Sequence, residues 1–516
     1  MEAAGESQLT ALRRVDGRVV RALPVGLALA AGAWLRVWML KEFPQVSGDT
    51  LIYGGLAKNL LHGQYAITDG SGVLHSTLIR LPGYPLFLAA CFRLFGVENY
   101  NAVAYVQIAL ELLGCLLLAG FARRIAPPEL KSGAALCTLW LAAFCPFTAS
   151  YAVAPLTETL TLFAIALALW AVGRFNERPG WWSALAFTFA VSYAALLRPD
   201  GALVAVALTP ALVVGLRGKT SERHTAGAKA RVDSTPLTAR LKSCPDTKPS
   251  FSAACKTPGL ARMAVVCVLL ALAPFGAWTA RNWRVFHVFE PLAPRYANDP
   301  GETAYPGWQR WVKSWCLDFV STYDIYWNVP GGALDLSKLP GRAFDSPAQY
   351  AETAALAQAY NDNGQDFAPD MDARFARLAE ERVEAKPLRF YLWLPLGRVA
   401  DMWLRPRVEN LPIDLDWWVY AHHDAETRFS WGYAGLNAVY LLLGLAGLCF
   451  RPKYWPWMVA YMVLRSALLL TVEAPEARYT LECFPMLFAL GGITLYRLTY
   501  VGLGSVLKVK ASEGKD

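Results

Sequence analysis

Acidic and basic side chains recur at the ends of apolar segments, where chemistry at a membrane surface would need them. Asp49 follows the first long apolar segment, and Glu158 lies at the start of another, in APLTETLTLF. Arg198, Arg281 and Arg478 also stand at the ends of apolar segments. A carboxylate can accept a proton from an attacking hydroxyl, and a guanidinium can bind phosphate through its planar fork. These residue types suggest hydroxyl activation beside a bound anion.

Asp49 has two interpretations at this stage. The apolar residues Ile52, Tyr53, Leu56 and Leu60 recur at the spacing of one helix face, so a helix is expected to follow Asp49. An aspartate at the start of a helix is a common N-cap. A carboxylate held by that helix at the mouth of a membrane cavity is the functional alternative. Position alone leaves both open.

Glu158 and the Arg198–Asp200 pair also have structural interpretations. Pro155 is a good first residue for the predicted span, which places Glu158 about one turn inside its outer end. An acid in a first turn favours the helix dipole. An ionisable residue at membrane depth is costly, however, so it more often marks a site. Arg198 and Asp200 turn the chain between two spans and could form a local ion pair.

Arg281 and Arg478 stand where the positive-inside rule discourages arginine, at the outer ends of predicted spans. Binding of an anion such as phosphate would explain them. The alternative is pairing with a nearby acid such as Glu473 or Glu476. The acids and arginines form a ring near the outer surface, whereas a secondary transporter places its polar groups near the midplane. An enzyme whose substrate arrives laterally from the membrane is therefore favoured.

The elements that must position these residues are membrane helices. Hydrophobic residues make up 55% of the 516 residues and charged residues only 17%, against about a quarter charged in soluble domains. Apolar runs of about 18 residues or more indicate spanning helices. The sequence predicts a mainly α, polytopic transmembrane bundle of about ten spans: 22–40, 101–122, 133–150, 156–173, 181–197, 201–216, 262–280, 433–450, 454–471 and 481–499. The shorter segment 81–96 is expected at the interface.

Charge placement orients this bundle. With the N-terminus inside, every predicted inside loop is basic, from the cluster at Arg13–Arg21 to Lys508 and Lys510. Both termini are therefore expected in the cytoplasm of a multi-pass plasma (inner) membrane protein. The net charge of +8 is mostly this topology signal and does not indicate nucleic-acid binding.

The chain divides accordingly. The expected regions are a cytoplasmic N-terminus (1–21), a membrane core (22–216) that includes a first outer loop (41–100), a disordered basic linker (217–261), a span (262–280), an outer periplasmic region (281–432), further spans (433–499) and a cytoplasmic tail (500–516). Within the outer region we expect a helix near 346–361 and a helical pattern over 372–404. The later half of that pattern mixes aromatic residues with arginine, as interfacial helices do.

Metal and disulfide chemistry find little support. Cys316 is the one cysteine in the large outer loop, so that loop has no obvious internal bridge. His422, His423 and Asp424 are a weak metal candidate, and a solvated polar loop explains them better. Asp49 with Glu158 could hold one divalent ion, but no dense carboxylate cluster calls for it.

Several stretches, taken in order, resemble the GT-C superfamily of glycosyltransferases. Asp49 after the first span, RLPGYPLFLAACFRLFG, WTARNWRVFHVFEPL and EARYTLECFPMLFALGG are similar to the RgtA/B/C/D-like and protein O-mannosyltransferase group (family 39/83 type), to which lipid A aminoarabinose transferases are related. Many members have an Asp-Glu pair in the first loop, whereas Thr50 follows Asp49 here.

The resemblance implies a glycosyltransferase that moves a sugar, with inversion, from a polyprenyl-phosphate donor to a hydroxyl of a glycan, lipid or protein at the periplasmic face, without a cofactor. It implies catalytic roles for Asp49 and Glu158. It implies donor-phosphate binding by Arg281, Arg478 and Arg198, and substrate binding by Arg80, Tyr84 and Tyr479. A transporter or flippase of lipid-linked sugar is the alternative, and a non-catalytic scaffold would leave Asp49 and Glu158 far apart.

Overall fold

The computed structural model describes residues 2–44, 46, 48–214, 258–368, 370–414 and 423–513, and within them the expected mainly α fold is confirmed. The strands β1 (Ala66–Thr68) and β2 (Leu74–Ser76) form one antiparallel hairpin. The longer helices are α1 (Glu2–Glu42), α2 (Asp49–Leu61), α3 (Gly83–Phe95), α4 (Tyr100–Ile125), α5 (Lys131–Ala143), α6 (Pro146–Ala152), α7 (Glu158–Glu177), α8 (Trp181–Leu197), α11 (Pro258–Phe286), α12 (Pro306–Lys313), α14 (Pro347–Asp362), α15 (Met371–Ala385), α16 (Leu394–Leu404), α17 (Asp424–Gly447), α18 (Trp455–Leu469) and α19 (Phe484–Glu513).

The helices make this a multi-pass membrane protein. In the described residues, six are long and apolar enough to cross a membrane: Ala22–Glu42, Tyr100–Ile125, Glu158–Glu177, Gly259–Phe286, Asp424–Phe450 and Ala477–Tyr500. The pair Pro128–Ala143 and Pro146–Ala152, bent by 54°, is a seventh if it forms one span. Trp181–Leu197 and Pro199–Val214 are apolar but shorter, and α18 has 15 residues. The expected count of about ten is not confirmed.

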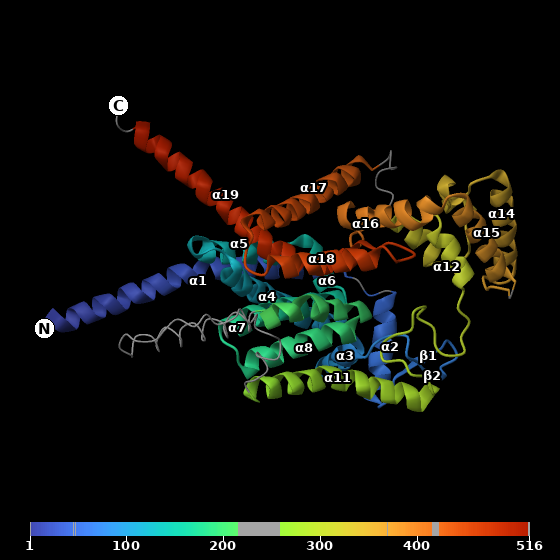
Figure 1. The fold of residues 1–516 in the computed structure, drawn as a ribbon, viewed down its shortest axis with the longest axis horizontal. Helices are drawn as coiled ribbons and strands as arrows, with labels where there is room; N and C mark the ends of the chain where they lie inside the picture. Colours follow the sequence, from blue (N-terminus) through green and yellow to red (C-terminus); the bar gives the residue numbers. More distant parts are fainter. Residues whose placement is uncertain are drawn as a thin grey trace, which may run out of the picture.

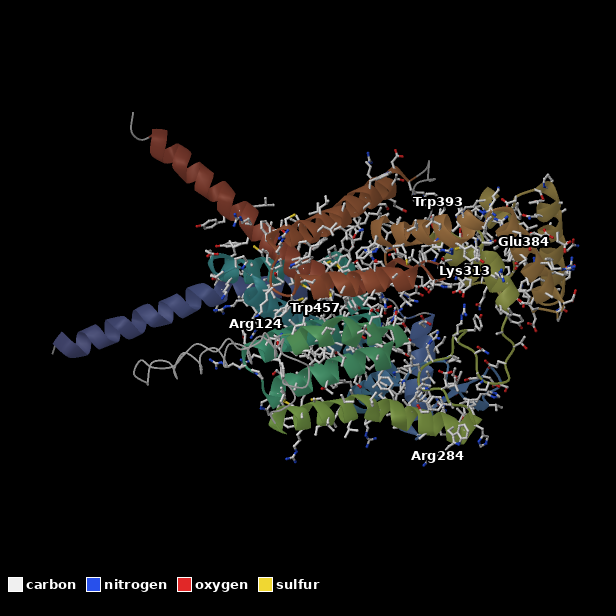
Figure 2. All side chains as sticks on the ribbon, in the orientation of Figure 1. Arg124, Arg284, Lys313, Glu384, Trp393 and Trp457 are labelled. Carbon is white, nitrogen blue, oxygen red and sulfur yellow. The ribbon has the colours of Figure 1, made fainter. Side chains whose placement is uncertain are left out.

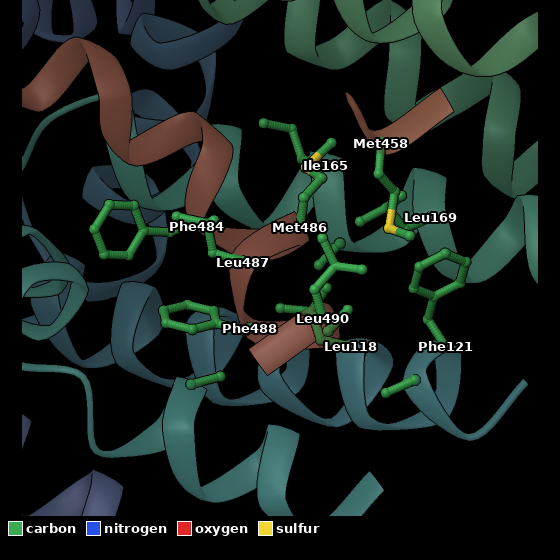
Figure 3. Packing of buried hydrophobic residues seen from close by; sticks show 14 of the residues in the cluster. Leu118, Phe121, Ile165, Leu169, Met458, Phe484, Met486, Leu487, Phe488 and Leu490 are labelled. Atoms are coloured by element: carbon green, nitrogen blue, oxygen red, sulfur yellow. The ribbon is translucent and has the colours of Figure 1, made fainter. Parts of the chain in front are cut away.

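The bundle packs around α4, α5, α7 and α19. Helix α19 lies against α5 and α17, while α4 packs on α5 and α7. A Cβ atom at Gly492 would lie 2.0 Å from Thr138 Oγ1, so α19 and α5 approach too closely for a larger residue there. Figure 3 shows how buried side chains from these helices interdigitate, with Phe121, Leu169 and Leu487 among them.

Helix α11 lies at one side of the bundle and packs on α8 (Figure 1). Almost none of its apolar stretch is buried by other helices, as expected of a surface that faces lipid. Its C-terminal end lies close to the β1–β2 hairpin (Figure 1), because Arg281 bonds to the carbonyl oxygens of Tyr65 and Thr77 on either side of that hairpin.

A second core lies in the outer region, at the end of the molecule opposite the start of α1 (Figure 1). Trp308, Trp311 and Trp315 are buried there between α12, α14 and α15. Both ends of the outer region, expected at 281 and 432, differ from expectation, because α11 continues to Phe286 and α17 already begins at Asp424. The pattern expected over 372–404 is interrupted at Lys386, since the residue before a proline is disfavoured in a helix.

Some expectations fall outside the described residues. Of the predicted linker 217–261, residues 217–257 lie there, and 258–261 belong to α11. His422 is also outside, while His423 lies 3.7 Å from Glu426. The predicted terminal segments 1–21 and 500–516 fall mostly within the helical backbones of α1 and α19.

Candidate active site

A cavity of about 410 Å³ lies where α2, the start of α7, the turn after α8 and the segment before α19 meet. Six of the predicted site residues line it: Asp49, Arg80, Glu158, Arg198, Arg478 and Tyr479. They come from segments far apart in the sequence, so the fold gathers them. Asp49 and Glu158 therefore share one cavity, which argues against the scaffold alternative.

Asp49 accepts hydrogen bonds from two arginines. It is the first residue of α2, and Gly48, not Asp49, occupies the cap position, so the capping interpretation is wrong. Arg80 Nη2 lies 2.9 Å from Asp49 Oδ1, and Arg478 Nη2 lies 3.3 Å from Oδ2. Burial alone would raise the pKa of Asp49, but Arg478 and Arg80 together hold that pKa below its ordinary value. The carboxylate is therefore ionised in the resting site.

Glu158 lies deeper, with its side chain only 3% exposed. It is the first residue of α7, so Pro155 does not start this helix as expected; it lies in the preceding bend. Arg198 Nη1 donates to Glu158 Oε1 across 3.2 Å, and Arg478 Nη1 lies 3.6 Å from the same oxygen. Arg478 therefore bridges the two carboxylates predicted to be catalytic.

An inner ion network supports this arrangement. Arg198 pairs with Asp200 as the sequence suggested, at 3.4 Å, and also lies 3.4 Å from Glu482. Arg465 bonds to Asp200 and lies 3.0 Å from Glu482. Arg465 and Glu482 were not predicted from the sequence, although an ionisable residue within an apolar stretch such as YMVLRSALLL is itself a signal of a functional site.

The turn that carries Arg198 and Asp200 needs a glycine. A Cβ atom at Gly201 would lie 2.4 Å from the carbonyl carbon of Ala194 in α8. Only the absence of a side chain lets the turn sit this close to the helix backbone. The sequence LLRPDGAL therefore fixes both charged residues at the cavity wall.

Arg478 and Tyr479 lie in the 3-10 helix Ala477–Cys483 that leads into α19. Arg478 Nε donates to Glu476, which was one of the partners considered for it from the sequence, and the Tyr479 hydroxyl donates to the same carboxylate. The Arg198 guanidinium lies over the Tyr479 ring, 5.0 Å from its centroid. The Tyr479 ring thus lies against the guanidinium groups of both Arg198 and Arg478.

Two predicted site residues do not line the cavity. The Tyr84 side chain is fully buried, and its hydroxyl donates to Gln107, whose amide in turn donates to the carbonyl oxygens of Ala152 and Ala154. Tyr84 thereby supports the bend that precedes Glu158. Arg281 donates to the carbonyl oxygens of Thr77 and Tyr65 instead of facing the cavity.

The segment between α11 and α12 closes the remaining side. Ala293, Pro294, Arg295 and Ala297 line the cavity from this segment. The Arg295 side chain is 73% exposed and lies 3.7 Å from Glu473. Sequence analysis did not single out Arg295, because nothing in the local pattern shows that this segment returns to the membrane core.

Among the described residues, no three His, Cys, Asp or Glu side chains gather in a way that could hold a metal ion. Asp49 and Glu158 both engage arginines instead. The cavity therefore combines acidic side chains with guanidinium groups. Such a set can bind an oxyanion through the guanidinium groups and take up a proton on a carboxylate.

Residues 80–229 match the family model described as dolichyl-phosphate-mannose-protein mannosyltransferase. Arg80, Glu158 and Arg198 lie inside the matched stretch, whereas Asp49 and Arg478 lie outside it. No curated protein matches the chain.

Two solved proteins are similar at low identity. The archaeal oligosaccharyltransferase AglB from Archaeoglobus fulgidus, in complex with an inhibitory peptide and a dolichol-phosphate, is 11% identical with a TM-score of 0.45, over 96% of this chain and 52% of AglB. ArnT from Cupriavidus metallidurans bound to undecaprenyl phosphate is 15% identical with a TM-score of 0.35, over 93% of this chain and 78% of ArnT. The chain thus spans about half the length of AglB.

The family match covers part of the membrane bundle and the wall of the cavity that carries Glu158 and Arg198. Over residues 80–229, the chain is similar to the dolichyl-phosphate-mannose-protein mannosyltransferases.

Proposed function

We propose that this protein is a membrane glycosyltransferase that moves a sugar from a polyprenyl-phosphate donor to an acceptor hydroxyl, with inversion, at the periplasmic face. The observation that carries the proposal is the cavity that joins Asp49 to Arg80 and Arg478. The family match supports the class of reaction. The description of the matching family suggests a lipid-phosphate donor. The proposed acceptor is a glycan, lipid or protein hydroxyl.

The donor phosphate would be bound by the cavity arginines. Arg478 lies near both Asp49 and Glu158, so an incoming phosphate can take over some of its N–H groups without leaving it unpaired. Arg198, held by Glu158 and Asp200, presents a second guanidinium at the same wall. Fixed cations that face a leaving phosphate stabilise the charge that it gains in the transition state.

Asp49 would remove the proton from the acceptor hydroxyl. In the resting cavity, burial raises the pKa of Asp49, but Arg478 and Arg80 lower it more, so the pKa lies below its ordinary value. Asp49 is therefore a weak base in the resting site. Recruitment of Arg478 by the donor phosphate removes part of that stabilisation. Asp49 therefore becomes a stronger base when the donor is in place, which couples hydroxyl activation to donor binding.

Inversion follows from a single displacement. The hydroxyl attacks the anomeric carbon while the bond to the lipid phosphate breaks, and the hydroxyl proton passes to Asp49. The phosphate leaves with the bonding electron pair and is held by the arginines. One base and one set of cations are sufficient, so no covalent sugar–enzyme intermediate is needed.

The test replaces Asp49 with Asn in purified protein and measures sugar transfer from a polyprenyl-phosphate donor. Loss of a general base is expected to lower the rate ~10²–10⁴-fold. Glu98→Gln is the matched control, because Glu98 is an exposed acid that pairs with Lys58 away from the cavity. Transfer by Asp49→Asn at the wild-type rate would remove Asp49 from the mechanism.

A transporter would give a different result. Movement of the lipid-linked sugar across vesicles without any new glycosidic bond would select the flippase alternative over the enzyme. Product analysis by mass spectrometry distinguishes the two, because transfer alone changes the mass of the acceptor.

A further inference from the structure

Arg281 ties a distant helix to the hairpin beside the active site. Its Nη1 donates to the carbonyl oxygen of Thr77 at 2.7 Å, and its Nη2 donates to that of Tyr65 at 2.8 Å. Tyr65 directly precedes β1, and Thr77 directly follows β2. One side chain on α11 therefore holds both ends of the hairpin.

The hairpin ends lead directly to Arg80. The Tyr65 hydroxyl donates to the carbonyl oxygen of Arg80 at 2.9 Å, and Thr77 lies three residues earlier in the same loop. Arg80 in turn donates to Asp49 at 2.9 Å. We infer that Arg281 is a positioning residue of the active site, which holds Arg80 against Asp49 by fixing the two ends of the hairpin.

The surroundings of Arg281 suit this role. Its guanidinium lies 5.4 Å from the ring centroid of Tyr65 and 5.2 Å from those of Trp278 and Phe286. Leu78 and Leu81, which flank Arg80, are buried against Trp278. A flat guanidinium can stack on these rings while two of its N–H groups reach separate carbonyl oxygens. The loop that carries Arg80 is thus packed and bonded to α11 at once.

A second anchor holds the same loop. The backbone N–H of Leu78 donates to Asp299 Oδ1 at 2.7 Å, and Asp299 belongs to the segment between α11 and α12. That segment also lines the cavity, through Ala293 to Ala297. Asp299 bonds to this loop at Leu78, whereas Arg281 bonds to it at Tyr65 and Thr77.

The end of α11 offers a matched control. Arg284 lies one turn beyond Arg281, is exposed, and extends away from the bundle in Figure 2. Arg284→Gln removes the same charge from the same helix without touching the hairpin. Arg281→Gln removes the hairpin bonds, and Arg281→Lys keeps a donor but loses the flat stacking surface.

The measurement is the pH dependence of carbodiimide labelling at Asp49, followed by mass spectrometry of its peptide, which requires no sugar transfer. The charged and titratable groups that face Asp49 come from several elements. They are Arg80 from the hairpin loop, Arg478 from the segment before α19, Tyr53 from α2, and Glu158 and Arg198 across the same cavity. Loss of one arginine partner raises a carboxyl pKa by about one unit or more. Arg80→Gln is therefore expected to raise the labelling midpoint by about one pH unit.

Arg281→Gln is expected to raise the midpoint as Arg80→Gln does, while Arg284→Gln keeps the wild-type midpoint and Arg281→Lys falls between. Tyr65→Phe, which keeps the ring and removes only the hydroxyl bond to Arg80, is expected to shift it in the same direction by less. If Arg281→Gln does not fold, the labelling midpoint of Tyr65→Phe tests the inference instead. The inference is overturned if the labelling midpoints of Arg281→Gln and Tyr65→Phe both equal that of Arg284→Gln. It is also overturned if Arg80→Gln leaves the midpoint unchanged.

The catalytic meaning of this role rests on the proposed function, and the two can fail separately. If the wild type transfers no sugar, the proposed reaction fails while the labelling series still decides whether Arg281 positions Arg80. If the wild type does transfer sugar, the acid limb of its rate profile should move upward in Arg281→Gln and stay in place in Arg284→Gln. An active wild type whose limb stays fixed in Arg281→Gln contradicts the inference.

Discussion

Asp49 and Glu158 are each held by two guanidinium groups, and Arg478 is common to both. Because a guanidinium presents five donors, it can contact a carboxylate and a phosphate together. Under the proposed function, an incoming phosphate would exchange partners with the two carboxylates at these arginines.

This exchange predicts a difference between two pH profiles. The acid limb of kcat/KM reports the free enzyme, in which the pKa of Asp49 lies below its ordinary value. The acid limb of kcat reports the donor complex, in which the phosphate draws Arg478 away and the pKa rises. Because Asp49 must be ionised to act, activity is lost as pH falls through each pKa. The kcat limb is expected about one pH unit above the kcat/KM limb.

Steady-state rates measured across acid pH check this expectation. If the acid limbs of the kcat and kcat/KM profiles coincide, or if the kcat limb lies at lower pH, donor binding does not draw Arg478 away from Asp49. Asp49→Asn serves as the control, since neither limb can then belong to residue 49.

At the scale of elements, the chain breaks between α5 and α6. Pro146 has no N–H, so α5 ends at Ala143 and the chain bends by 54°. Arg36 on α1 donates to the freed carbonyl of Ala143 and pairs with Glu111 on α4. A buried cation thus satisfies a helix end that water cannot reach.

Glu111→Gln is therefore expected to destabilise the protein strongly. It leaves the fully buried Arg36 with no anionic partner, and breaking a buried pair from one side costs about 3–5 kcal/mol. Glu98→Gln breaks an exposed pair with Lys58 and should cost about 1 kcal/mol or less. Thermal unfolding in detergent compares the two. Equal melting temperatures for these variants would show that the Arg36–Glu111 pair does not brace the break.

At the scale of the whole molecule, the start of α1 and the end of α19 lie at one end, and the outer-region helices α12, α14 and α15 lie at the other (Figure 1). The β1–β2 hairpin lies toward the outer-region end (Figure 1), and Arg80, which lines the cavity, follows that hairpin in the chain. The basic segment between α17 and α18 contains Arg451 and Lys453, and the positive-inside rule predicts a cytoplasmic location for it. The cavity would then open toward the periplasm.

Labelling of intact cells with a membrane-impermeant maleimide tests this orientation. Gly70→Cys in the hairpin turn, where a Cβ atom meets nothing within 4 Å, is expected to react from outside. Native Cys449, exposed beside Arg451, is expected to react only after the membrane is permeabilised. Mass spectrometry assigns the label to each peptide. The reverse pattern would place the cavity on the cytoplasmic side and contradict the proposed periplasmic reaction.

The sequence by itself determined the membrane class and the main helices. Long apolar runs decide helix formation locally, because lipid offers the backbone no other hydrogen-bond partner. The helix after Asp49 was predictable from the spacing of its apolar residues, and the helix expected near 346–361 is also present. The span count was not, because a proline break and a short helix such as α18 look like full spans when only hydrophobicity is read.

Only the tertiary structure decided which charged residues share a site. Arg281 and Arg478 looked alike in the sequence, since each is an arginine at the end of an apolar segment. In the fold, Arg478 faces Asp49 across the cavity, whereas the N–H groups of Arg281 are taken by two carbonyl oxygens of the hairpin. The reason is physical: a guanidinium bonds to whichever acceptors lie within about 3 Å, and packing between distant segments sets those neighbours.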